Sequence, residues 1–192
     1  MTAHDVTWVP VAGMPLPVSA VDGPQCATTT SAACFSRTTR GAAFAAAHLV
    51  VRTFPFVGPH SFETTIGQQV VGEHRATLLR LTQQAYTDAA AAAGIDDGAS
   101  LPVPSTDAVA GYQIVAPADE AAAVPLTTVQ VGLVVRQADD GGAPTFTEFV
   151  ITLRWIDGDW RLEAPAWGDW RSAASTVSAP DTAVHPYDGG PR

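Results

Sequence analysis

The spacing of hydrophobic residues changes once along this chain, from a helical period to a strand period. Between residues 40 and 53, Phe44, Ala47 and Val51 recur at three- and four-residue spacing, which predicts one buried face of a helix. Pro55 ends this helix, because the residue before a proline disfavours helical backbone.

Two more helices are predicted before the period changes. A short one lies near residues 61–66, after Gly58 and Pro59. The clearest runs from about 70 to 93, and Gly94 is a natural stop because glycine readily adopts the left-handed cap. Its apolar stripe is formed by Leu78, Leu81, Ala85, Ala89 and Ala92.

Beyond Gly94 the pattern alternates with a period of two, which is typical of half-buried strands. Strands are predicted at 108–115, 126–136, 145–155 and 160–163. The runs Asp139-Asp140-Gly141-Gly142 and Asp157-Gly158 predict hairpin turns. The last three strands therefore form a meander.

Helices followed by antiparallel strands indicate an α+β fold, with N-terminal helices packed on a curved antiparallel sheet. The order suits the cone of cystatin-like and nuclear-transport-factor-2-like folds, in which the long helix fills the concave face. A plain helix-on-sheet sandwich is the alternative. We expect an extended Pro-rich arm over 1–25, anchored by Trp8, a single domain over 26–171, and a flexible tail over 172–192.

Charge and hydropathy narrow the class of partner. The chain has 192 residues and a net charge of -9, with 19 Asp+Glu against 10 Lys+Arg, which argues against direct nucleic-acid binding. No window is apolar enough to span a membrane, and the residues after Met1 do not resemble a signal peptide. We therefore expect membrane association only through an anchor that this sequence lacks.

Cys26 and Cys34 lie in a loop rich in small polar residues, with seven residues between them. This spacing closes a disulfide worth roughly 2–3 kcal/mol by loop entropy. Two free thiols in a cytosolic protein are the alternative. No CxxC or HxxxH motif occurs, so no metal site and no cofactor are expected.

Three residues are weak catalytic candidates. His48 and His74 lie on predicted helices, where either is suited to act as a general base, and Tyr112 is a candidate proton donor. The competing interpretation is that each is a structural residue satisfied by one hydrogen bond. The acidic residues are concentrated in turns, such as Asp157 and Asp159, where carboxylates cap backbone groups and stay hydrated.

Four tryptophans cluster near the end of the predicted domain: Trp155, Trp160, Trp167 and Trp170. They form either core and cross-strand pairs or an exposed aromatic patch for a protein partner. Trp167 and Trp170 follow the last predicted strand and are the better candidates for a partner site.

Several short motifs resemble an uncharacterised actinobacterial domain family associated with conjugative and integrative elements. Residues 35–48 read FSRTTRGAAFAAAH, the opening residues 6–8 read VTW, and residues 158–162 and 168–170 read GDWRL and GDW. The resemblance implies a cone-shaped domain outside the membrane, similar to scaffold proteins of type IV secretion channels. It implies no catalytic residues.

Two functions follow from these observations. The first is a non-enzymatic assembly or scaffold domain of a conjugation or type IV secretion-like apparatus, with protein partners or self-association. It would be extracytoplasmic and membrane-associated in a longer native form, or cytoplasmic if the chain is complete. The alternative is a small-molecule-binding or isomerase/dehydratase-like protein, with a pocket between the helix at 70–93 and the sheet.

Overall fold

The computed structural model describes residues 5–96, 98–103, 107–116, 125–137, 143–177, 180 and 183–187. Its helices are α1 (Thr39–Val51), α2 (Pro59–Gln69) and α3 (Arg75–Ala93), with 3-10 turns η1 (Pro55–Val57), η2 (Ala166–Gly168) and η3 (Trp170–Ser172). The strands are β1 (Val6–Val11), β2 (Met14–Ser19), β3 (Cys26–Ala27), β4 (Ala32–Ala33), β5 (Val70–Val71), β6 (Ala108–Ala116), β7 (Thr128–Gln137), β8 (Thr145–Ile156), β9 (Asp159–Glu163) and β10 (Ala174–Val177).

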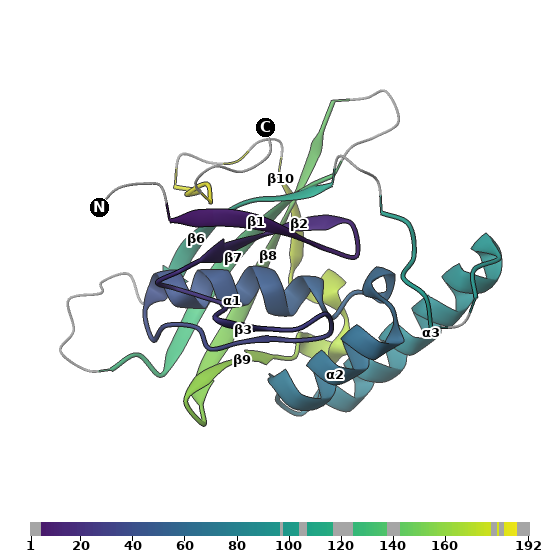
Figure 1. The fold of residues 1–192 in the computed structure, drawn as a ribbon, viewed down its shortest axis with the longest axis horizontal. Helices are drawn as coiled ribbons and strands as arrows, with labels where there is room; N and C mark the ends of the chain where they lie inside the picture. The colour runs from purple at the N-terminus through teal and green to yellow at the C-terminus, as the bar shows by residue number, and fades with distance from the viewer. Residues whose placement is uncertain are drawn as a thin grey trace.

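The main sheet has the strand order β5-β9-β8-β7-β6, with β10 also paired to β8 (Figure 1). The meander from β6 to β9 is antiparallel, and only β5 runs parallel to its neighbour β9. Asp157 and Gly158 both have positive φ in the two-residue turn between β8 and β9. The α+β class and this turn are confirmed, whereas the predicted turn at 139–142 lies outside the described residues.

Helix α1 is the centre of the core. Every one of its residues except Arg40 is buried. Figure 1 shows it crossing in front of the sheet, where it packs on β6, β7 and β9, while β2 and β4 cover its other sides. Five alanines give α1 a slim surface, so that Val131 and Leu133 of β7 are fully buried beneath it.

The sheet-covering helix is therefore not the one that we expected. Helix α3 packs against α2, η1 and η2, at one end of the molecule (Figure 1). Its buried residues are Leu78, Thr82, Tyr86 and Ala90, whereas Ala85 and Ala92 are exposed. Of the predicted stripe, Leu78 is buried and Leu81 and Ala89 are half-buried. The prediction was wrong for the other two alanines, because alanine favours helix on exposed faces as well as on buried ones.

The N-terminal segment is extended as expected, but it forms a hairpin that belongs to the core. Strands β1 and β2 pair across a tight turn at Ala12 and Gly13, which both have positive φ. Met14 and Leu16 are buried against the rest of the core. Prolines are tolerated because this hairpin is a separate two-stranded sheet, with no central strand to disrupt.

The segment beyond residue 171, expected to be a flexible tail, contributes two ordered pieces among its described residues. Strand β10 pairs with β8, and His185 forms an isolated bridge with Tyr112 of β6. Tyr187 is buried, and its hydroxyl donates a hydrogen bond of 2.7 Å to the carbonyl of Ala43 in α1. Its aromatic ring holds this segment to the core despite the polar composition around it.

The start of α1 ties the hairpin to the core through charge. Arg40 forms ion pairs with Asp5, just before β1, and with Asp22, just after β2. The Ser19 hydroxyl donates to the Asp5 carboxylate at 2.6 Å. The hydrogen bond from Arg40, followed by that from Ser19, lowers the pKa of Asp5 from 3.8 to about 2.

Two glycines in helices occupy opposite environments. A Cβ at Gly41 of α1 would lie 2.1 Å from the carbonyl oxygen of Ser36, whereas a Cβ at Gly67 of α2 would meet nothing within 4 Å. The Gly41 amide also donates to the N-cap Thr38 hydroxyl at 2.9 Å. The chain therefore needs glycine at position 41 and does not need it at position 67.

We predict that Gly41→Ala lowers the free energy of unfolding by about 2 kcal/mol or more, because the clash outweighs the helix propensity of alanine. The matched variant Gly67→Ala should raise it by roughly 0.5–1 kcal/mol, because nothing obstructs its methyl group. Urea unfolding of both variants measures the difference. Equal effects of the two substitutions would contradict this packing.

We also predict an acid-sensitive contribution from Asp5. A carboxyl group whose pKa is lower in the folded state stabilises the fold above its unfolded pKa, and loses that contribution as the pH falls from about 4 to about 2. The Asp5→Asn variant removes the titrating group, so its stability should fall less steeply over this range. Urea midpoints at several pH values test this, and parallel curves for the two proteins would refute it.

Candidate functional site

A groove of about 630 Å³ opens where β9 leaves β8 and β10 joins it. Strand β9 pairs with β8 at 153–156, and β10 pairs with it at 146–149. The segment between these pairings forms the floor of the groove. Residues that line it include His74, Val150, Ile151, Glu163, Trp170 and Ser175.

Trp167 stands beside this groove. It is 75% exposed, and its indole lies 5.8 Å from the imidazole of His74, which lines the groove. Its backbone is left-handed, with φ 60 and ψ 8. A residue with a side chain pays roughly 1–2 kcal/mol for this conformation. The fold therefore keeps the Trp167 side chain exposed to solvent even though its backbone conformation is unfavourable.

The next residue explains how Trp167 is held in place. A Cβ at Gly168 would lie 2.5 Å from the backbone nitrogen of Leu78 and 2.9 Å from the carbonyl carbon of Thr77. Turn η2 thus contacts the α3 backbone directly, at a distance that only glycine allows. This contact fixes the base of the Trp167 side chain against the start of α3.

The other three tryptophans have structural roles. Trp170 is buried, and its indole Nε1 donates to the Thr53 hydroxyl at 3.0 Å. Trp160 is fully buried and donates to the Ser36 carbonyl at 2.8 Å. The two side chains are therefore fixed within the core.

Trp155 is half-buried against the Trp160 ring, and the Arg37 guanidinium lies 5.3 Å from its centre. The four tryptophans therefore do not form one exposed patch. Trp167 is the one that keeps most of its surface in contact with water.

His48 is a core residue of α1 with both ring nitrogens engaged. Its Nε2 lies 2.8 Å from the carbonyl oxygen of Pro17, and its Nδ1 lies 2.8 Å from Nη1 of Arg52. Because the carbonyl and the guanidinium can only accept and donate respectively, Nε2 carries the proton and Nδ1 accepts. Burial, followed by the Arg52 charge, lowers the pKa of His48 to about 3. His48 is therefore neutral, with both of its ring nitrogens already bonded.

The structure does not bring the three catalytic candidates together. Tyr112 lies on the edge strand β6, which β7 and β8 separate from β9, and its ring is 4.8 Å from that of Tyr187. His74 lies at the groove, where its Nε2 is 3.3 Å from the Glu73 carboxylate. His48 lies inside the core.

The polar groups of the groove bond to neighbouring side chains and backbone groups. Glu163 accepts two hydrogen bonds from the exposed Arg154 guanidinium, at 2.9 and 3.1 Å. Ser172 donates to the backbone carbonyl of Asp169. In the described part of the chain, no hydrogen bond joins His74 to a hydroxyl group, and no group of three His, Cys, Asp or Glu residues is placed to hold a metal ion.

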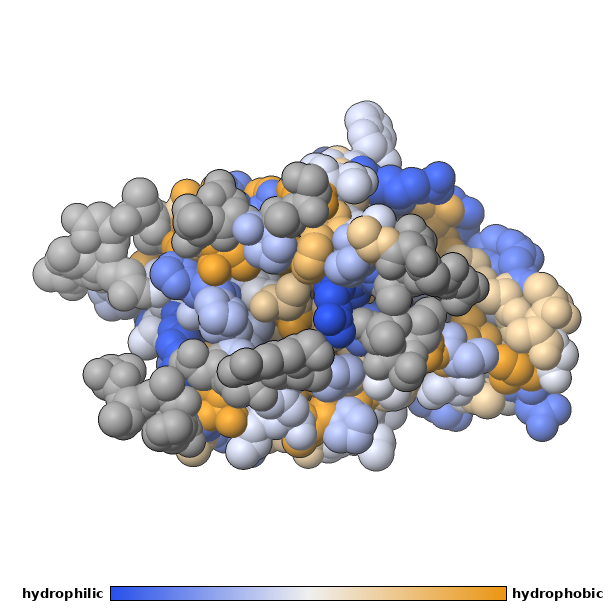
Figure 2. Space-filling view, turned by 90° about the horizontal axis from the view of Figure 1, so that it is seen from above, coloured by the Kyte–Doolittle hydropathy of each residue, from blue (hydrophilic) through white to orange (hydrophobic). Residues whose placement is uncertain are grey.

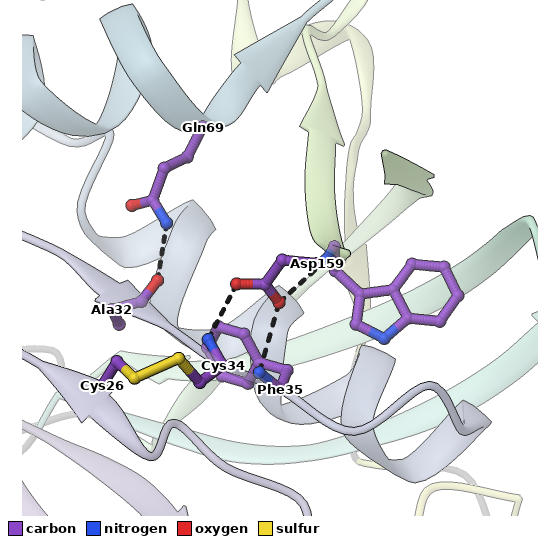
Figure 3. The surroundings of a disulfide bond; sticks show 7 residues. Cys26, Ala32, Cys34, Phe35, Gln69 and Asp159 are labelled. Carbon is purple, nitrogen blue, oxygen red and sulfur yellow. Dashed lines mark hydrogen bonds between the residues drawn. A yellow bond between two sulfur atoms is a disulfide. The ribbon is translucent and has the colours of Figure 1, made fainter. Parts of the chain in front are cut away.

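The predicted disulfide between Cys26 and Cys34 is present, with Cα atoms 5.3 Å apart. Figure 3 shows the Asp159 carboxylate reaching it from the start of β9. This carboxylate accepts hydrogen bonds from the amides of Cys34 at 2.7 Å, Phe35 at 3.2 Å and Trp160 at 2.9 Å. The expectation that Asp159 caps backbone groups is confirmed, but the accompanying expectation of a hydrated turn carboxylate is wrong, because Asp159 is buried at the start of β9.

A second contact holds the same loop. The Gln69 amide at the end of α2 donates to the Ala32 carbonyl at 2.6 Å (Figure 3). We refer to residues 26–35 as the disulfide loop. It is therefore fixed to the domain by Asp159 on one side and by Gln69 on the other, and sequence patterns alone gave no signal for the Gln69 contact.

These features define a disulfide-bonded α+β domain built around one buried helix, with an exposed tryptophan beside a groove. The chain belongs to the family described as domain of unknown function (DUF8175), whose family model matches residues 1–183. Neither the curated proteins nor the solved structures gave a significant match. Among the described residues, no helix has the length and apolar character needed to cross a membrane.

We predict that Asp159→Asn lowers the free energy of unfolding by about 2 kcal/mol. The asparagine side chain has one acceptor oxygen, whereas the three backbone N–H groups share the two carboxylate oxygens of Asp159 in the native protein. The exposed Asp88 of α3 provides the control, and Asp88→Asn should change stability by less than about 0.5 kcal/mol. Urea unfolding with the disulfide intact measures both. A similar, small effect at both positions would mean that the carboxylate does not hold the loop.

Proposed function

We propose that this domain is a non-enzymatic assembly module that binds a protein partner through Trp167 and the adjoining groove. The observation that carries the proposal is the exposed indole of Trp167, held in a left-handed conformation by the contact between Gly168 and α3. Tryptophan is the residue most enriched at the energetic centres of protein interfaces. Backbone strain at an exposed residue is more typical of function than of stability.

A second exposed apolar residue supports the same surface. Val150 on β8 is 43% exposed and lines the groove. Apolar residues on the floor, such as Val150, and polar ones in the lining, such as Glu163, give the mixed character that is common at protein interfaces. In the view of Figure 2, hydrophilic and hydrophobic residues are interspersed over the described part of the surface.

The setting that we propose is extracytoplasmic. The disulfide between Cys26 and Cys34 supports this, because such bonds persist in oxidising compartments and are rare in the cytosol. A role in a conjugation or type IV secretion-like apparatus, and the finer cystatin-like cone, rest on the sequence resemblance and remain narrower proposals. The enzyme alternative has less support, because His48, His74 and Tyr112 lie in three separate parts of the fold.

The proposal is tested by site-specific photo-crosslinking in the native host. A photoreactive residue at the exposed Ala166, which borders the groove, should give a discrete higher-mass adduct. The same residue at Val21, an exposed position on the N-terminal segment, should not give that adduct. Mass spectrometry of the adduct then identifies the partner.

We predict that Trp167→Gly abolishes this adduct while the free energy of unfolding changes by less than about 1 kcal/mol, because glycine relieves the left-handed strain and few contacts are lost. The far-UV spectrum and the urea midpoint report on folding. The proposed interface would be refuted if the photoreactive residue gave the same adduct at positions 166 and 21, or if the adduct still formed in the Trp167→Gly variant.

A further inference from the structure

A second cavity, of about 450 Å³, lies on another side of the molecule, between the β1–β2 hairpin, the disulfide loop and the start of α2. Its walls are mostly apolar or hydroxyl-bearing, with one buried cation. Lining residues include Val9, Val11, Thr28, Arg52, Val57 and Ser61. None of the lining residues of this cavity belongs to the groove beside Trp167.

Arg52 is the unusual member of this set. It is 2% exposed, and no carboxylate in the described residues lies within ion-pair distance of it. Among the described residues, its side chain makes one hydrogen bond, from Nη1 to the neutral imidazole of His48, which accepts without neutralising the charge. Burial lowers the pKa of Arg52 to about 10, so the guanidinium remains protonated at neutral pH.

The Arg52 guanidinium has N–H donors that no described residue accepts. Nε is sealed from water without a hydrogen-bond partner. Since Nη1 is used by His48, Nη2 is the donor that a molecule in the cavity would meet. Burying a cation without a counter-charge is costly, and the carbonyls at the end of α1 offset only part of it. In a chain of net charge -9, an unpaired buried arginine therefore points to an anion from outside the chain.

An independent polar group lies on the same wall. The Ser61 hydroxyl is buried and has no hydrogen-bond partner among the described residues, and it also lines the cavity. Ser61 lies in the first turn of α2, where Gly58 provides no side-chain cap. The positive end of this helix adds to the attraction for an anion.

We propose that this cavity binds a small organic carboxylate, with Arg52 as the counter-charge, Ser61 as a second donor and the apolar walls around a short acyl chain. One guanidinium beside a neutral imidazole supplies a single positive charge, which matches a monoanion better than a doubly charged phosphate. Val9, Val11 and Val57 offer apolar surface to the chain of the ligand. This site is independent of the protein interface proposed above.

Butyrate is the probe that we would titrate first, at constant ionic strength, into the intact disulfide-bonded protein. The readout is the Nε–Hε resonance of Arg52 in ¹⁵N-labelled protein. Butyrate should shift it with millimolar affinity. Butyramide and inorganic phosphate should bind at least about tenfold more weakly, because butyramide lacks the charge and phosphate lacks an acyl chain for the apolar walls.

Variants separate the site from a general effect of salt. Arg52→Gln should weaken butyrate binding by about tenfold or more, and Ser61→Ala by roughly threefold, as measured by calorimetry. Arg154→Gln, at an exposed arginine on the sheet, should leave binding unchanged. If Arg52→Gln does not fold, Ser61→Ala and the ligand series still decide the question.

Three results would overturn this proposal. Equal binding of butyramide would show a cavity that takes any small apolar molecule. Phosphate binding as tightly as butyrate would show an anion site without preference for carboxylates. Folded wild-type protein whose Arg52 resonance does not move at high butyrate concentration would show that the guanidinium is not a ligand-binding group.

Discussion

Burial of α1 on all sides is the constraint on which the rest of this structure depends. A helix surrounded in this way needs small side chains, and α1 supplies five buried alanines against the sheet, the hairpin and the disulfide loop. It also needs internal partners for its polar groups, which explains why His48 bonds to the hairpin at Pro17 and why Ala43 accepts from Tyr187. Segments that are irregular on their own thus become ordered by covering one helix.

The elements that local pattern determines were predictable from the sequence. The alternation through Val129, Val131 and Leu133 marks one buried sheet face, and Asp157-Gly158 marks a tight turn, because each signal is complete within a few residues. The N-terminal hairpin was less accessible, since its turn at Ala12 and Gly13 resembles no strong turn motif and prolines argue against strands. The placement of α3 depended on which alanines are buried, and composition does not reveal that.

The same distinction applies to the candidate site. The pairing of Cys26 with Cys34 follows from spacing, whereas four neighbouring tryptophans look alike in sequence. Tertiary contacts distinguish Trp167 from Trp160. The contact between Gly168 and α3 leaves the Trp167 side chain exposed, whereas the Trp160 side chain is buried in the core. Arg52 likewise resembles an ordinary solvated residue at a helix end until the hairpin and the disulfide loop enclose it.

The Asp159 contact also bears on how the chain matures. The two cysteines are 8 positions apart, so they can meet as soon as their own segment is available. The carboxylate that accepts from the Cys34 amide lies 125 positions further along, in the last hairpin of the meander. During synthesis from the N-terminus, formation of the disulfide can therefore precede the contact with Asp159. Until Asp159 is in place, the amides of Cys34 and Phe35 in the crosslinked loop are free to bond to water.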